Sequence, residues 1–136
     1  KSRGLKIIGR LRSWSSKGCD PKIMGFGPVP ATQDALKRYS EICGKTKTVD
    51  DMDLVEVNEA FAAQSIACIR ELGLQDNDPR INPNGGAIAI GHPLGVTGAR
   101  ILYSAALELQ LTQKRYALIT MCIGVGQGYA VIIERV

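Results

Sequence analysis

RYALITMC-IGVGQG-YAVIIERV, residues 115–136, contains two apolar segments separated by a six-residue, glycine-rich turn. Both segments are rich in Val, Ile, Leu and Tyr, which predicts β-strands over Arg115–Cys122 and Tyr129–Val136. Two parallel strands need a long crossover, usually a helix, and six residues are too few to form one. The end of the chain is therefore predicted to be an antiparallel pair inside a sheet.

Strand and helix patterns alternate through the rest of the sequence. Strands are predicted over 5–14 and 54–57, with a third, short one near 80–82. Helical spacing of apolar residues predicts a helix over 31–42 and another after Asn58 that ends at Gly73. This order predicts one α/β domain over residues 1–136, with a mixed, mostly parallel five-stranded sheet and helices on both faces.

The segment 99–109 is a predicted helix whose apolar residues lie almost all the way round its axis. A helix with one polar face covers one side of a sheet, whereas a helix of this kind needs apolar neighbours on more than one side. We therefore expect a second surface to pack against its far face.

Composition excludes several classes of protein. The 136 residues are 45% hydrophobic and 22% charged, as in ordinary globular domains. No apolar run reaches the roughly 18 residues that a membrane span requires, and no secretory signal is visible. The four cysteines show no Cys-x-x-Cys spacing, which argues against a disulfide framework or a zinc site. The net charge of +4 comes from scattered basic residues, so we expect no nucleic-acid or membrane partner, and a cytoplasmic location.

Three positions carry residues suited to chemistry, and each also has a structural interpretation. Asn58 follows a predicted strand directly, where it can either cap the next helix or present its amide to a ligand. His92, the only histidine, lies between Gly91 and Pro93 and can be a structural loop residue or a proton-transfer group. Cys122 ends a predicted strand and can be an inert buried thiol or a reactive one.

Four motifs in the sequence resemble the C-terminal half of the thiolase family, in the same order and spacing. They run along essentially the whole chain and read CDPKIMGFGPVP (19–30), NEAF (58–61), GGAIAIGHPLG (85–95) and CIGVGQG (122–128). The forms NPNGG and GVGQG lean toward the degradative 3-oxoacyl- or 3-oxoadipyl-type thiolases. Ketoacyl and HMG-CoA synthases are relatives within the enzymes, but ketoacyl synthases lack a cysteine at the start of the last motif.

The resemblance implies acyl transfer between acetyl-CoA or coenzyme A and a 3-oxoacyl-CoA by reversible Claisen chemistry. His92 would take the proton of a nucleophilic cysteine, and Cys122 would be the second, acid/base cysteine. Asn58, through a water, would help His92 stabilise the enolate oxygen, and the Gly124 N–H would stabilise the acyl carbonyl. Phe61 would form a wall of the substrate pocket. Coenzyme A is a substrate here, and neither a cofactor nor a metal is implied.

The nucleophilic cysteine of thiolases belongs to an N-terminal domain of similar fold, and no sequence context here resembles it. We therefore expect the chain alone to be inactive, with an N-terminal thiolase domain as its partner and a homo-oligomer as the assembly. The alternative is a non-catalytic thiolase-like module that binds coenzyme A or a lipid.

Overall fold

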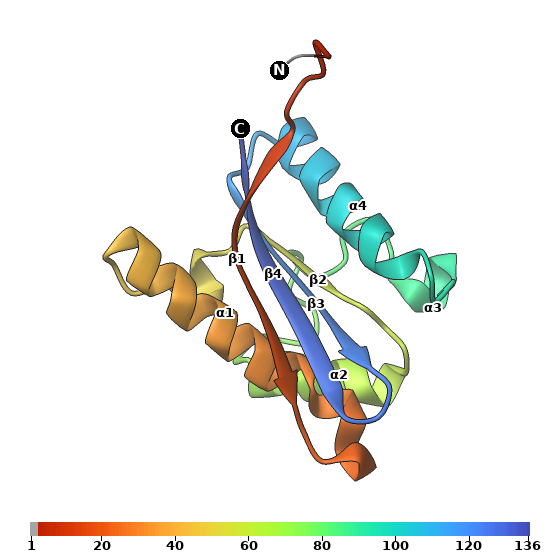
Figure 1. Cartoon of the computed structure of the whole chain (residues 1–136). Helices are drawn as coiled ribbons and strands as arrows, with labels where there is room; N and C mark the ends of the chain where they lie inside the picture. Colours follow the sequence, from red (N-terminus) through yellow and green to blue (C-terminus); the bar gives the residue numbers. More distant parts are fainter. Residues whose placement is uncertain (1–2) are drawn as a thin grey trace.

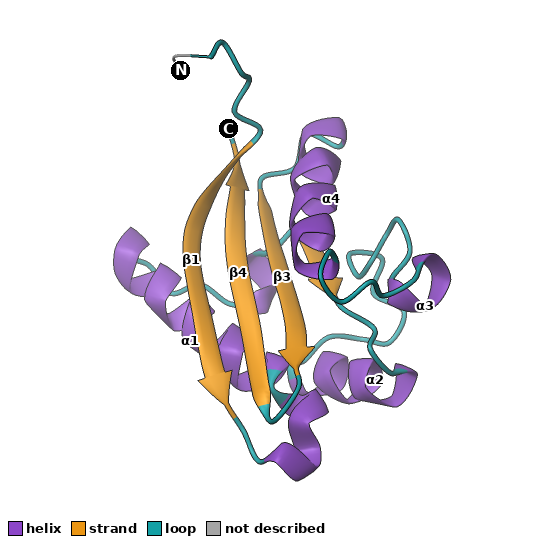
Figure 2. Ribbon diagram, turned by 45° about the vertical axis from the view of Figure 1, so that its right-hand side comes forward, coloured by secondary structure: helices purple, strands orange, loops and turns teal. Residues whose placement is uncertain are grey.

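A computed structural model describes residues 3–136, and its centre is a four-stranded sheet. The strand order is β1 (Gly9–Gly18), β4 (Gln127–Arg135), β3 (Tyr116–Ile123), β2 (Leu54–Val57). The predicted antiparallel pair at the chain end is confirmed as β3 and β4, with Cys122 opposite Gly128. Figures 1 and 2 show β4 between β1 and β3, with the two termini at the same end of the sheet.

The predicted five-stranded, mostly parallel sheet is wrong in two respects. The segment near 80–82 adds only a single bridge, from Ile81 to Val55, because the Asn82 side chain takes over the next pairing position. Its amide donates to Val57 O and accepts from Val57 N, and the positive φ of 43° at Asn82 turns the chain away. Of the strand pairs, only β2 with β3 is parallel, since β1 lies antiparallel beside β4.

Helices cover both faces of the sheet, as predicted (Figure 1). One face carries α1 (Pro28–Cys43) and α2 (Ala62–Glu71), whose apolar side chains pack with Val55, Leu118 and Ile132. The other face carries α4 (Thr97–Leu111), which packs on alternate residues of the same strands. A one-turn helix, α3 (Ala87–Ile90), lies between the helix that ends at Gly73 and the predicted helix 99–109, where no helix was predicted. Two 3-10 turns, η1 (Pro21–Phe26) and η2 (Val49–Asp51), complete the elements.

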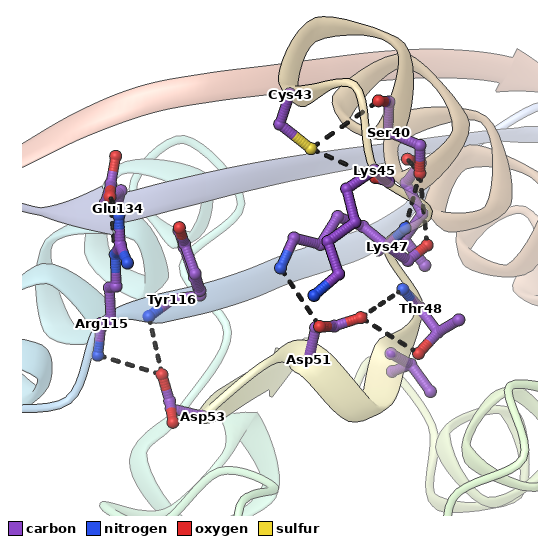
Figure 3. A network of polar contacts seen from close by, with 12 residues as sticks. Ser40, Cys43, Lys45, Lys47, Thr48, Asp51, Asp53, Arg115, Tyr116 and Glu134 are labelled. Atoms are coloured by element: carbon purple, nitrogen blue, oxygen red, sulfur yellow. Dashed lines mark hydrogen bonds and ion pairs between the residues drawn. The ribbon is translucent and has the colours of Figure 1, made fainter.

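An acidic loop aligns the start of β2 with the start of β3 (Figure 3). Asp53 accepts the backbone N–H groups of Arg115 and Tyr116 on its carboxylate, at 3.0 and 2.9 Å. Just upstream, Asp51 and Thr48 form a reciprocal capping box that closes η2. Asp53 satisfies two backbone donors at the start of β3 and holds the register of the parallel pair, whereas Asp51 closes the turn that precedes it.

Helix α4 has an inner face in the core and an outer apolar face that the described residues leave open. Ile101, Ala105 and Leu109 are buried, whereas Tyr103 and Leu111 are 59% and 79% exposed. A mainly apolar groove of about 350 Å³ runs between α4 and the chain around Ile8 and Leu11. Within residues 3–136 nothing covers this face, so the expectation that a second surface packs on it stays a prediction.

The turn between β3 and β4 packs directly against the segment that leads into α1. A Cβ atom on Gly128 would overlap the backbone of Gly27, and one on Gly27 would overlap Gln127 and Gly128. The Cys19 N–H also donates to Gly126 O at 2.8 Å. The two backbone segments cross in contact at Gly27 and Gly128, and this crossing requires glycine at both positions. It connects the first and last motifs of the chain.

We expect Gly128→Ala to lower the free energy of unfolding by about 2 kcal/mol or more, because the new methyl group meets backbone that cannot move aside. Gly124→Ala in the same turn is the matched control: its Cβ would point into open space and its φ is not positive. That variant should stay within about 0.5 kcal/mol of the parent. Urea unfolding measures both, and equal losses would contradict the crossing as the cause.

We expect the chain by itself to self-associate through the outer face of α4, because contiguous exposed apolar residues on a monomer usually mark a contact surface. The double variant Tyr103→Lys, Leu111→Lys should lower the association in sedimentation velocity. Ile42→Lys, at an equally exposed apolar residue on α1, should leave it unchanged. A stable monomer for the parent chain would contradict this expectation.

Candidate active site

Asn58 lies at the carboxyl end of β2 and is held there by the neighbouring strand. Its backbone N–H donates to Thr120 O at 3.0 Å, which continues the β2–β3 pairing one residue beyond Val57. The side chain is 2% exposed, and its Nδ2 lies 3.3 Å from Nε2 of His92. Asn58 makes no cap hydrogen bond to α2, whose first turn begins after Phe61. Its amide instead meets the imidazole, 34 residues further along the chain.

His92 is half-buried between α3 and α4, with both ring nitrogens in contact with side chains. Nδ1 lies 2.8 Å from Thr97 Oγ1, and Nε2 faces Asn58. The preceding Gly91 has a φ of 92°, so the chain can leave α3 and turn directly into His92. Arg100 of α4 donates to Gly91 O at 2.7 Å and holds this turn. The imidazole is therefore fixed in place by residues from β2's end and from α4.

Glu59 connects the end of β2 to the loop that carries His92. One carboxylate oxygen accepts the Ile88 N–H at 3.0 Å, at the start of α3, and the other accepts from Asn82 Nδ2 at 3.1 Å. A Cβ on Gly86 would overlap this carboxylate, so a larger residue there would displace the Glu59 side chain from its hydrogen bonds. Asn58 thus contacts the imidazole, and Glu59 positions the loop that carries it.

Cys122 lies near the end of β3, two residues beyond Thr120, and is buried. Burial raises the pKa of its thiol, so the neutral form is favoured. Strand alternation places Cys122 on the same face as Thr120, whose hydroxyl contacts Pro28 O in α1, whereas His92 is held from the α4 side. The two groups can therefore meet only beyond the ends of β2 and β3. No hydrogen bond joins them within residues 3–136, and their predicted convergence stays a prediction.

Gly124 and Phe61 are both solvent-exposed. Gly124 lies in the β3–β4 turn, and its Cα faces open space, so nothing within the described chain requires a glycine there. Phe61 is 60% exposed just before α2. Their predicted roles, as oxyanion donor and pocket wall, stay predictions.

Glu56 is a buried carboxyl group beside Asn58 that the sequence analysis did not single out. Its pKa is raised from 4.5 to about 7, mainly by burial and then by the charges of Glu108 and Glu59, while Arg100 acts in the opposite direction. Glu56, Asn58 and Arg100 line a cavity of about 20 Å³, which has room for one water. Asn58 Oδ1 and Arg100 Nε are buried without a protein partner, as expected if such a water bridges them.

Three residues of this region were missed as site residues from sequence. Glu56 had a usable signal, since a charged residue inside the apolar strand LVEV is costly unless its carboxyl is neutral or paired. Thr97 and Glu59 had no such signal, because both act through contacts with residues distant in the sequence. Within residues 3–136 the structure contains no cluster of three or more residues able to hold a metal ion, and no helix long and apolar enough to span a membrane.

The contact between Asn58 and His92 lies at the carboxyl end of β2, the edge where open α/β sheets place their ligand sites. Comparison with known families then identifies the family of the chain. Residues 5–135 match the family described as Thiolase, C-terminal domain, and the chain belongs to this family.

Several characterised thiolases are similar to this chain over nearly its whole length. The 3-oxoadipyl-CoA/3-oxo-5,6-dehydrosuberyl-CoA thiolase of Escherichia coli (strain K12) is 52% identical over 135 residues, 99% of this chain and 32% of that protein. The 3-ketoacyl-CoA thiolase of Vibrio parahaemolyticus is 53% identical over 133 residues, 97% and 32% of the two chains. The crystal structure of the Bacillus anthracis acetyl-CoA acetyltransferase superimposes with a TM-score of 0.89 at 39% identity, covering 99% of this chain and 32% of that one. The chain thus spans about a third of the length of these relatives.

We expect Glu56→Gln to stabilise the chain at high pH and not at low pH. With a folded pKa raised from 4.5 to about 7, Glu56 contributes stability that is complete below pH 4.5 and is lost as pH rises through 7. The variant should therefore gain about 3 kcal/mol relative to the parent between pH 4.5 and pH 8. Urea unfolding at the two pH values measures this. Glu71→Gln, at an exposed side chain, is the control, and a pH-independent difference for Glu56→Gln would contradict the assignment.

Proposed function

We propose that this chain is the C-terminal, acid/base half of a thiolase that transfers an acyl group between a 3-oxoacyl-CoA and coenzyme A. The observation that carries the proposal is the contact of Asn58 with His92 at the carboxyl end of β2. Across 34 residues of sequence, it joins two of the motifs on which thiolase chemistry depends. Membership in the thiolase C-terminal family supports the same reaction.

The proposed cycle uses each group in the protonation state that its surroundings favour. His92 takes the proton of a nucleophilic cysteine, which attacks the β-carbonyl carbon of the substrate. The bond between the α and β carbons then breaks, and Cys122, a neutral thiol because burial raises its pKa, donates its proton to the enolate carbon of acetyl-CoA. Coenzyme A gives its thiol proton to Cys122 and takes the acyl group, while His92 returns the first proton to the nucleophile.

Stabilisation of the two oxyanions is assigned to groups around the same edge of the sheet. The amide of Asn58, through a water, and His92 serve the enolate oxygen, and the Gly124 N–H serves the acyl carbonyl. Phe61 borders the reacting carbons from the start of α2. Coenzyme A enters as a substrate, and the proposed cycle requires neither a metal nor an organic cofactor.

The nucleophile in this proposal comes from an N-terminal thiolase domain, consistent with the chain spanning a third of its relatives. That domain would cover the outer face of α4, where Tyr103 and Leu111 are exposed. The active assembly is then a cytoplasmic homo-oligomer of complete subunits. The names of two relatives favour a 3-oxoacyl-CoA with a dicarboxylic acyl chain as substrate.

A chimera tests this proposal: residues 5–135 replace the matching third of the E. coli relative. We expect the chimera to cleave acetoacetyl-CoA or 3-oxoadipyl-CoA with coenzyme A, measured as a loss of thioester absorbance. We expect the chain alone to be inactive in the same assay. His92→Ala and Cys122→Ser should each lower kcat by about 10²–10⁴. Cys43→Ser, at an exposed cysteine, is the matched control and should keep full activity.

Three other results would each contradict a different part of the proposal. Turnover by the chain alone would contradict the need for a second domain. Full activity of Cys122→Ser would contradict the acid/base role of that thiol. A folded chimera that binds coenzyme A without turnover would favour the non-catalytic, CoA-binding alternative.

A further inference from the structure

Within residues 3–136, the hydroxyl group of Thr97 is a hydrogen-bond partner of His92 that the proposed cycle does not use. Thr97 is the first residue of α4 and is completely buried. Its Oγ1 lies 2.8 Å from His92 Nδ1 and 3.1 Å from the carbonyl oxygen of Pro93, four residues earlier. The ring nitrogen and the carbonyl therefore share a single hydroxyl group.

The proton positions follow from the donors available. A hydroxyl has one proton, and a threonine in the first turn of a helix ordinarily donates it to the carbonyl four residues earlier. We assign the Thr97 proton to Pro93 O, which it shares with the N–H groups of Val96 and Thr97, so that a lone pair of Oγ1 faces His92. In this assignment Nδ1 of the neutral imidazole carries the ring proton and donates it to Oγ1. On the other side of the ring, Asn58 presents its Nδ2 donor to Nε2, which completes the same pattern.

The surroundings prevent the ring from taking another arrangement easily. Thr97 is β-branched and buried, so its side-chain torsion is restricted to few rotamers. The backbone of Pro93 is tied to α4 by the N–H groups of Val96 and Thr97, at 2.8 and 3.0 Å from its carbonyl oxygen. Arg100 holds Gly91 O on the other side of His92. The acceptor for Nδ1 is therefore part of the same rigid turn that carries the ring.

We propose that Thr97 is a positioning residue that fixes His92 as the Nδ1-protonated tautomer, so that Nε2 carries no proton and presents its lone pair to the Asn58 amide. Nε2 is then the only ring atom able to take a proton from the nucleophilic cysteine. The tautomer is a property of this chain alone, and only its catalytic use rests on the proposed function. Without the Thr97 acceptor the ring can place its proton on Nε2, the wrong atom for a base at this site.

Nuclear magnetic resonance tests the tautomer directly, because His92 is the only histidine in the chain. With ¹⁵N-histidine label, long-range ¹H–¹⁵N spectra of the neutral side chain should show a protonated Nδ1 and an unprotonated Nε2. If the chain self-associates, the Tyr103→Lys, Leu111→Lys background serves for all samples. A protonated Nε2 in the parent chain would overturn the proposal without any variant of Thr97.

The isosteric variant Thr97→Val removes the acceptor and keeps the shape. We expect the ratio of the Nδ1-protonated to the Nε2-protonated form to fall about tenfold, as for the loss of one hydrogen bond. Thr97→Ser is the matched control and should keep the parent ratio, so it carries the test if the valine variant does not fold. An unchanged ratio in folded Thr97→Val would overturn the proposal, as would loss of the Nδ1 proton in folded Thr97→Ser.

Activity of the chimera separates this inference from the proposed function. An Nδ1-protonated ring in an inactive chimera means that the proposed function fails and the role of Thr97 in the tautomer stands. A protonated Nε2 in an active chimera means that only the present inference fails. In an active chimera, Thr97→Val should lower kcat at least about tenfold with little change in KM, and Thr97→Ser should restore it.

Discussion

The parallel pairing of β2 with β3 is the constraint on which the rest of the site depends. The backbone bond from Asn58 to Thr120 O carries this pairing one residue beyond the strand, so the Asn58 side chain is fixed relative to β3 and Cys122. Glu59, the next residue, then holds the loop at Ile88, and the loop ends in His92. A shift of one residue in this register would place Asn58 opposite residues of β3 that face the other side of the sheet. At the other end of the same pair, Asp53 holds the register through the N–H groups of Arg115 and Tyr116.

Low solvent access gives the site its electrostatic character. Burial raises the pKa of the Cys122 thiol and of the Glu56 carboxyl, which shifts both groups toward their neutral forms. In the proposed cycle, a neutral Cys122 thiol has a proton to donate to the enolate carbon. The same burial leaves polar atoms of Asn58 and Arg100 without protein partners, which is tolerable only where water reaches them.

Much of the architecture could be predicted from the residues alone. The period of apolar residues located the main helices and strands, and the six-residue turn identified the antiparallel pair β3–β4. The error lay in the sheet: the segment around Ile81 resembles a strand by composition, yet the Asn82 side chain replaces its backbone in pairing with Val57. The position of β1 beside β4 was also not predictable, because pairing between segments over 100 residues apart leaves no periodic signal.

The sequence by itself determined the family, the order of the elements and the residue types at the candidate site, because these depend on local pattern and on motifs of fixed spacing. Only the tertiary structure decided which side chains meet. It brought Asn58 to the imidazole, placed Thr97 at Nδ1 and buried Glu56 beside them. Hydrogen-bond geometry and desolvation depend on atoms that are distant in the chain and close in space, and no single-residue pattern contains that information.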